Sequence, residues 1–430
     1  FANILVQSGF NTSLIQKSKI KEIDYSTVFY FSFFIAAILY VLLFQLAPVI
    51  AMFYEQPQLT SILRVLSVTL FIGAVNSIQI AVISRNMQFK KLFYSSFIAT
   101  LISGFIAILL AFSSLGVWAL VIQQISYQFL VTFIMLFTVQ WKPRIVFSYK
   151  RLKLLFNYGW KILATHLLSN IFLNIRSLII GKLYSAETLG FYNRGMIIPS
   201  VLVSNIDGSI QSVMLPSYSS QQENKEIVKK MVRRSIMTSS FIVFPMMVGL
   251  AAVAEPFVSL ILTDKWLQAV PFLQIYCFIF ALMPIHTANL QAIKALGYSG
   301  TVLKLEIIKK AMDILILLIT IPKGIYAIAI GELISSLIST LINSYPNNKY
   351  LRYSFKEQWI DVLPSLLLSL VMGIIVYSIT FIGYNKLLTI IVQILIGVIV
   401  YITLALVFKI ESFYFLLNSL RGTFKNKDRY

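Results

Sequence analysis

The chain has 430 residues, of which 58% are hydrophobic and only 12% are charged, and its mean hydropathy is +0.82. A soluble domain carries about 25% charged residues, so this chain cannot cover itself with a polar surface and is predicted to be a polytopic membrane protein. Its net charge of +20 is dispersed over many short loops, which argues against a nucleic-acid partner.

Apolar runs of about 20 residues, long enough to cross a bilayer, recur from end to end. They lack the alternation of apolar and polar residues that outer-membrane barrel strands show, so an all-α integral membrane fold is predicted. We expect a leading helix to precede Phe1, and a partial span over 1–16. Twelve full spans are predicted to follow, at about 25–53, 60–84, 90–112, 115–139, 154–182, 187–216, 232–254, 268–292, 299–320, 324–345, 360–382 and 387–408.

The loops between these spans fall into two alternating charge classes. One class is almost free of basic residues and contains only Lys182, Lys265, Lys323 and Lys386. The positive-inside rule places the other class, together with the C-terminus, in the cytoplasm. The basic residues of that class include Lys17, Lys19, Lys21, Arg85, Lys90, Lys91, Lys142, Arg144, Lys229, Lys230, Arg233, Lys349 and Arg352. Some of these cations are expected to contact membrane lipids.

Two short motifs predict an internal repeat of 208 residues. GVWA at 116–119 returns as GIYA at 324–327, and Pro48 matches Pro256 at the same offset. Six spans separate equivalent points, so both copies would cross the membrane in the same direction. The predicted parts are an N-terminal bundle over 1–148 that is truncated at its start, a C-terminal bundle over 149–356, two extra transmembrane helices over 357–409 and a cytoplasmic tail over 410–430.

Two neighbouring spans each carry a continuous polar stripe. The polar residues of 154–182 fall on one face of a 3.6-residue helix, and a second stripe runs along 187–216. A lipid-facing helix would not carry such a stripe, so both are expected to face protein or water. The stripes comprise Lys161, Thr165, His166, Ser169, Asn170, Asn174, Arg176 and Ser177, and then Asn193, Arg194, Ser200, Ser204, Asn205, Asp207, Gln211 and Ser212.

Five stretches of this sequence match a known family. GFNTSLIQ (9–16), RNMQFKKL (85–92), LGVWALV (115–121), LIIGKLYSAETLGFYNRG (178–195) and MLPSYSSQQ (214–222) resemble the Wzx-type polysaccharide flippases of the multidrug/oligosaccharidyl-lipid/polysaccharide exporter superfamily. The resemblance implies two six-helix bundles around a central cavity, followed by two C-terminal helices. It also implies export of lipid-linked oligosaccharide across the bacterial inner membrane by alternating access, for surface polysaccharides such as lipopolysaccharide, with polymerase and glycosyltransferases as partners.

The predicted substrate would be a polyprenyl diphosphate that carries a sugar chain. Its anionic diphosphate must cross an apolar layer about 30 Å thick, and guanidinium groups bind phosphate oxygens bidentately. We therefore expect Arg176 and Arg194 to form a cationic shelf in the outer half of the cavity, and Lys161 to lie in its inner half. Amide and hydroxyl groups would replace water around the sugars, as predicted for Asn170, Asn174 and Ser204. The alternative is that both arginines cap helix ends or extend to the membrane interface.

Two carboxylates are candidates for coupling transport to a proton or cation. Asp207 is predicted at the depth of Lys161, so it serves either as a coupling site or as the structural partner of that lysine. Glu332 stands where the first repeat copy has Gln124, so the fold does not require this carboxylate. In 299–320, the pairs Glu306–Lys310 and Lys309–Asp313 either neutralise each other or form a cation site on the cytoplasmic side.

Two other functions compete with the flippase. A multidrug antiporter of the same superfamily would favour acidic and aromatic residues, whereas the stripes here are basic. A membrane glycosyltransferase or polymerase would need an active site on a large outer loop, and the outward loops are short, so no enzyme activity is expected. The lone Cys277 and two isolated histidines predict neither a metal site nor a cofactor.

Overall fold

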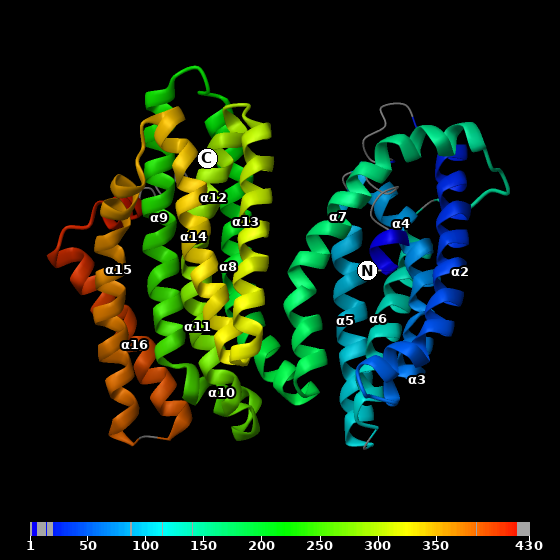
Figure 1. Ribbon diagram of the computed structural model, residues 1–430, viewed down its shortest axis with the longest axis horizontal. Helices are drawn as coiled ribbons and strands as arrows, with labels where there is room; N and C mark the ends of the chain where they lie inside the picture. The colour runs from blue at the N-terminus through cyan, green and yellow to red at the C-terminus, as the bar shows by residue number, and fades with distance from the viewer. Residues whose placement is uncertain are drawn as a thin grey trace, which may run out of the picture. The chain divides into compact units, whose positions relative to one another are not determined.

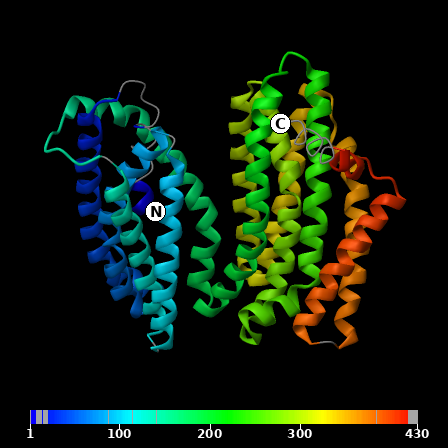
Figure 2. The same cartoon turned by 180° about the vertical axis from the view of Figure 1, so that it is seen from behind.

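The computed structural model describes residues 2–6, 14, 20–86, 88–113, 115–139, 141–383 and 385–418. Within those ranges every regular element is a helix, and no strand occurs, as Figures 1 and 2 show from two sides. The predicted all-α membrane fold is therefore confirmed. The chain divides into two compact units, Phe1–Lys182 and Leu183–Tyr430, which are described one at a time.

The first unit is built around a helical hairpin and a central helix. α5 packs along α6, and α4 lies between α6 and α2. Apolar side chains fill this unit in two clusters, one around Ile78 and Met135 and the other around Leu70 and Ala74. Its helices are α2 (Glu22–Phe53), α3 (Gln58–Leu66), α4 (Thr69–Arg85), α5 (Phe89–Phe112), α6 (Val117–Thr138) and α7 (Tyr149–Leu183).

The second unit packs α8 against α11 and α12, and α15 against the length of α9. One large apolar cluster joins these helices and includes Phe244, Met247 and Tyr401. The α-helices are α8 (Ala186–Ser219), α9 (Lys225–Ala252), α10 (Ala254–Leu262), α11 (Val270–Ala281), α12 (Met283–Ala295), α13 (Ser299–Thr320), α14 (Ile325–Leu351), α15 (Phe355–Ser378) and α16 (Lys386–Val407). Three short 3-10 segments connect them: η1 (Asp264–Ala269), η2 (Ile321–Lys323) and η3 (Ile379–Ile382).

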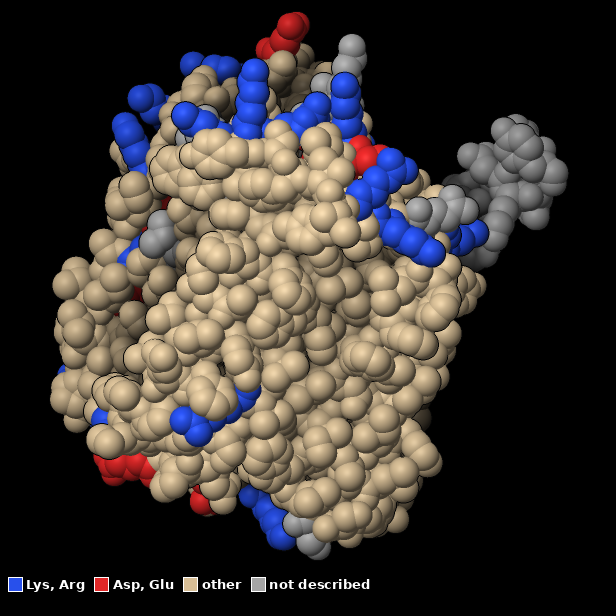
Figure 3. All heavy atoms as spheres, turned by 90° about the vertical axis from the view of Figure 1, so that its right-hand side faces the viewer, with Lys and Arg blue, Asp and Glu red and all other residues tan. Residues whose placement is uncertain are grey.

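Nine segments of the described chain are long and apolar enough to cross a membrane. They correspond to nine of the twelve predicted full spans. The other three predicted spans form α7, α8 and α13, which are 35, 34 and 22 residues long but richer in polar or charged residues. Lys and Arg gather toward one end of the face drawn in Figure 3, and a broad band below them is almost free of charge. The partial span over 1–16 lies largely outside the described residues.

Two of the predicted single spans are each broken into two helices. The span at 60–84 breaks between α3 and α4, where the hydroxyls of Ser67 and Thr69 donate to the carbonyls of Arg64 and Leu66 at 2.7 and 2.6 Å. The span at 268–292 breaks before α12, which begins with Pro284 in its first turn. Proline supplies no backbone donor, and side chains satisfy the carbonyls freed at such breaks.

The division into units falls after Lys182, whereas the repeat places a bundle boundary at 148/149. Nearly all of α7 belongs to the first unit, and ion pairs link both of its ends to the ends of α2. Arg151 lies 2.9 Å from the buried Asp24 at one end, and Lys182 lies 3.1 Å from Glu55 at the other. The bundle boundaries drawn from the repeat stay a prediction.

The two glycines of the repeated motifs occupy equivalent local positions. Gly116 is the residue immediately before α6 and has φ 54°, and Gly324 immediately precedes α14 with φ 101°. L-residues rarely adopt positive φ, so glycine is favoured at both turns. This local correspondence supports the predicted repeat, which itself stays a prediction.

Gly195 lets α8 approach the backbone of α11. A Cβ atom at this position would lie 2.6 Å from Cβ of Phe272 and 2.7 Å from the amide nitrogen of Leu273. Backbone atoms cannot step aside as a flexible side chain can, so any larger residue must push the two helices apart.

We expect Gly195→Ala to lower the unfolding temperature in detergent, at a cost of about 1–3 kcal/mol from overpacking. Gly208→Ala, on the same helix, is the matched control because nothing lies within 4 Å of its added Cβ. Equal unfolding temperatures for the two variants would show that the α8–α11 contact is looser than described.

Candidate functional site

The predicted cavity residues of α7 are only partly described. Arg176 is 9% exposed, so protein covers its side chain. Asn174 is exposed, and its side-chain amide donates to the backbone carbonyl of the half-buried Asn170 at 2.8 Å. The side chain of Lys161 lies outside the described residues, as does that of His166. The burial of Arg176 disfavours the alternative in which this side chain extends to the lipid interface.

The predicted cavity residues of α8 lie in the second unit. Arg194 is exposed, and its guanidinium lies 5.7 Å from the ring centre of Trp266, a cation–π contact. Ser204 is also exposed, and its hydroxyl donates to the carbonyl of Val201 at 3.4 Å. Because Arg176 belongs to the first unit and Arg194 to the second, the cationic shelf that would join them stays a prediction.

Asp207 is buried in the second unit and takes part in a chain of hydrogen bonds. The side-chain amide of Gln211 donates to its carboxylate at 2.6 Å, and the side chain of Gln291 on α12 donates to Gln211 at 3.1 Å. Two amide groups thus link this carboxylate to a neighbouring helix. The predicted pair between Asp207 and Lys161 concerns a side chain outside the described residues and stays a prediction.

Glu332 on α14 meets two buried tyrosines from two other helices. The hydroxyls of Tyr192 on α8 and Tyr276 on α11 lie 3.0 and 2.6 Å from its carboxylate and 2.5 Å from each other. The two rings pack edge to face with centres 5.6 Å apart, and both side chains are about 1% exposed. This carboxylate therefore joins three helices at one point.

A buried amide network in the second unit is absent from the sequence-based prediction. Asn289 on α12 donates to Gln358 on α15 at 2.8 Å, and Asn347 on α14 donates to Asn289 at 2.5 Å. Next to it, His286 bonds to Thr340 and Asn343 at 3.1 and 2.9 Å. A signal exists in the sequence, because the polar residues of α14 recur every three or four positions: Thr340, Asn343, Ser344 and Asn347.

The charges of α13 are engaged within the second unit. Lys309 pairs with Glu306 at 2.6 Å, one turn earlier in the helix. Asp313 accepts a hydrogen bond from Ser335 on α14 at 2.8 Å. The pair of Lys309 and Glu306 favours neutralisation within the helix, although the partners differ from the predicted Glu306–Lys310 and Lys309–Asp313.

The fold and these side chains define the class: a multi-pass helical membrane protein whose spanning helices carry bonded charges and amides. A family described as polysaccharide biosynthesis protein matches residues 1–271. The chain belongs to this polysaccharide biosynthesis protein family, and the resemblance to Wzx-type flippases is confirmed.

Individual relatives agree with this assignment. The teichuronic acid biosynthesis protein TuaB of Bacillus subtilis is 24% identical over 384 residues, which cover 88% of this chain and 79% of the relative. The lipopolysaccharide biosynthesis protein WzxC of Escherichia coli is 21% identical over 386 residues, 87% of this chain and 78% of the relative. Among solved structures, lipid II flippase MurJ in an inward closed conformation matches with a TM-score of 0.77 at 16% identity, over 95% of this chain and 89% of MurJ. This likeness shows the fold.

Removing one phenolic hydroxyl tests whether the hydrogen bonds of Tyr192 and Tyr276 to Glu332 stabilise the packing of α8, α11 and α14. Tyr276→Phe is expected to lower the free energy of unfolding by about 1.5–3 kcal/mol, because the half-buried carboxylate of Glu332 loses a donor. Tyr326→Phe is the control, since this half-exposed tyrosine stacks on Phe272 nearby and should change stability by less than about 0.5 kcal/mol. Thermal unfolding of both variants in one detergent would measure the difference. Indistinguishable curves would contradict a stabilising role for the hydrogen bond between Tyr276 and Glu332.

Proposed function

We propose that this protein flips polyprenyl-diphosphate-linked oligosaccharide from the cytoplasmic to the outer leaflet of a bacterial inner membrane, for surface polysaccharide assembly. One observation carries the proposal: three long helices of a flippase-like fold, α7, α8 and α13, carry charged and amide side chains. Hydrocarbon excludes such groups unless they face protein, water or a polar cargo. Membership of the polysaccharide biosynthesis family supports a glycan as that cargo.

In this proposal a central cavity opens alternately to either side of the membrane. Arg176 and Arg194 bind the diphosphate, because guanidinium groups match its oxygens. Lys161 adds a cation nearer the cytoplasm, and the amide and hydroxyl groups of Asn170, Asn174 and Ser204 bond the sugars. The polyprenyl chain stays in the surrounding lipid. No residue breaks or forms a covalent bond, so the protein acts as a transporter, with glycosyltransferases and a polymerase before and after it.

Glu332 is the coupling candidate that its surroundings support best. Two tyrosine hydroxyls donate to its carboxylate, and a carboxyl that took up a proton would itself become a donor and compete with them. Gain or loss of one proton would therefore change the contacts among α8, α11 and α14. Asp207, which is bonded to Gln211, is the second candidate, and a purely structural role is its alternative.

The substrate-binding proposal predicts the effect of Arg176→Ala. Cells that depend on this protein should accumulate lipid-linked glycan in the cytoplasmic leaflet, and surface glycan should fall about tenfold or more, because one bidentate phosphate contact is lost. Arg64→Ala is the control, because Arg64 donates to the carbonyl of Phe44 and lies over its ring. Normal surface glycan in the Arg176 variant, at equal protein level, would remove this arginine from the site.

The coupling proposal predicts that Glu332→Gln separates transport from the proton gradient. An amide of the same size cannot take up a proton, so a pH gradient across proteoliposomes should no longer accelerate flipping of a labelled lipid-linked glycan. Glu187→Gln, an exposed position at the start of α8, should leave the acceleration intact. A gradient effect of unchanged size in Glu332→Gln would exclude this carboxylate as the coupling group without bearing on the cargo.

A further inference from the structure

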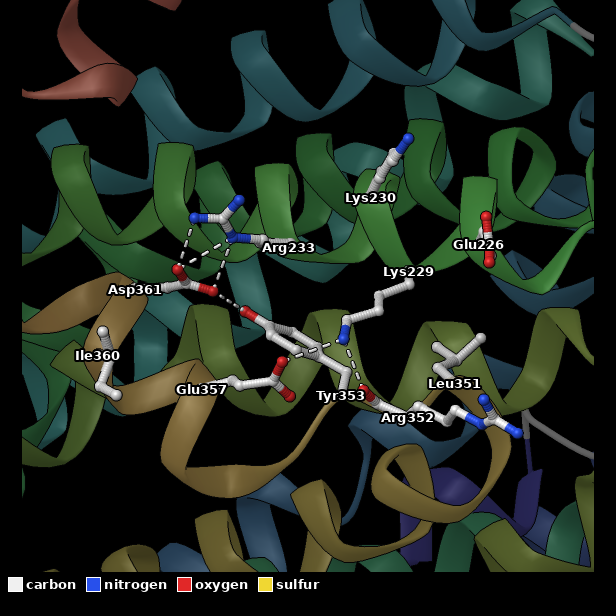
Figure 4. A pocket seen from close by; sticks show the side chains of 10 residues that line it. All are labelled: Glu226, Lys229, Lys230, Arg233, Leu351, Arg352, Tyr353, Glu357, Ile360 and Asp361. Atoms are coloured by element: carbon white, nitrogen blue, oxygen red, sulfur yellow. Dashed lines mark hydrogen bonds and ion pairs between the residues drawn. The ribbon is translucent and has the colours of Figure 1, made fainter.

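The second unit contains a cavity of about 520 Å³ where the first turns of α9 meet the connection between α14 and α15 (Figure 4). The candidate spans Lys225–Ala252 and Phe355–Ile382 both begin here, so the cavity lies at the level where spans meet the membrane surface. Ile360, 58% exposed, brings an apolar edge to its wall. Its volume falls in the range of small-ligand sites, about 300–1,000 Å³.

One part of the cavity wall is a fixed polar framework. Arg233 on α9 pairs with Asp361 on α15 at 2.8 Å, and the buried hydroxyl of Tyr353 donates to the same carboxylate at 2.7 Å. Burial, followed by the hydrogen bond to Asp361, raises the pKa of Tyr353 well above its ordinary value, so its hydroxyl stays a donor. Lys229 donates to Glu357 at 3.1 Å and to the carbonyl of Arg352 at 2.6 Å. Arg233 and Lys229 thus each link α9 to α15.

Two further cations of the wall, Lys230 and Arg352, do not take part in this framework. The side chains of Lys230 and Arg352 are exposed, and neither makes an ion pair or a side-chain hydrogen bond with any described residue. Arg352 ends α14 with φ 51°, a left-handed conformation that costs free energy in a residue other than glycine. The carbonyl bond to Lys229 holds this backbone in place. The cavity thus has one side fixed by ion pairs, and Lys230, Arg352 and the carboxylate of Glu226 complete its charged wall.

We propose that this cavity binds the phosphate headgroup of a membrane lipid, with Lys230 and Arg352 as its cationic ligands. Phosphate suits an ammonium and a guanidinium together, because Arg supplies a two-pronged contact and Lys a point charge. The acyl chains would lie beside the apolar edge at Ile360. The headgroup belongs either to a bilayer phospholipid or to the diphosphate carrier, and the second source rests on the proposed function.

A bound phosphate would join the start of α9 to the end of α14, next to the ion pairs between α9 and α15. It would therefore brace the attachment of the C-terminal helices to the rest of the second unit. This site differs from the predicted cavity residues of α7 and α8, none of which contributes to its wall.

Native mass spectrometry of the full chain in detergent can test this site, with added phosphatidylglycerol, a polyprenyl diphosphate or uncharged diacylglycerol. The double variant Lys230→Gln/Arg352→Gln should bind the phosphate lipids about 10- to 30-fold more weakly, because each interfacial cation contributes about fivefold. The matched control, Lys225→Gln/Lys349→Gln, removes two exposed cations from the ends of the same helices outside the cavity wall. It should bind within about twofold of the unmodified chain.

The outcomes separate the alternatives. Weaker binding of both phosphate lipids in the first double variant alone supports a site for their shared phosphate group. Loss confined to phosphatidylglycerol supports a bilayer lipid, and loss confined to polyprenyl diphosphate supports the carrier. Equal weakening in both double variants would reduce the site to diffuse charge at the membrane surface and overturn the proposal. Retention of diacylglycerol as strongly as the phosphate lipids would overturn it as well. None of these readouts depends on flipping, so they stand whether or not the proposed transport occurs.

Discussion

The hydrocarbon interior of a bilayer supplies no hydrogen bonds, so every polar side chain placed there must find its partner within the protein. The second unit meets this constraint by joining helices through shared polar groups. Glu332 connects α14 to α8 and α11, and Asn289 connects α12 to α14 and α15. These bonds act together with the large apolar cluster and specify which helix faces meet, because a rotated helix would leave buried donors unbonded. The polar groups that suggest function are thus also part of what fixes the helix packing.

Ion pairs also join helices at their ends, and two of these pairs have opposite polarity. In the first unit the acidic Asp24 belongs to α2 and the basic Arg151 to α7, the helix that follows the hairpin. In the second unit the basic Arg233 belongs to α9 and the acidic Asp361 to α15, the helix that follows α14. Each pair ties an earlier helix to one that comes after GVWA or GIYA.

Much of the fold follows from hydropathy and loop charge, because the length of an apolar run and the side on which lysines collect are one-dimensional signals. The nine apolar spans could be predicted from such signals, and so could the polar character of α7, α8 and α13. The break at Ser67 does not follow from the sequence, since a broken span has the same composition as a straight one, whereas Pro284 is a residue type that bends helices. The triad of Tyr192, Tyr276 and Glu332 depends on helices distant in sequence, and no spacing rule brings those three residues together. Lys230 and Arg352 appear in the sequence only as two loop cations among many.

The absence of a side chain at Gly195 has a mechanical consequence. At Gly195 the backbones of α8 and α11 are in direct contact, with no flexible side chain between them that could adjust to a small relative shift. The two helices are therefore expected to move as one body. Tyr192 lies on α8, three residues before Gly195, and Tyr276 lies on α11, three residues after Leu273. A displacement of α8 would therefore move both phenols together and change their hydrogen bonds to Glu332 on α14.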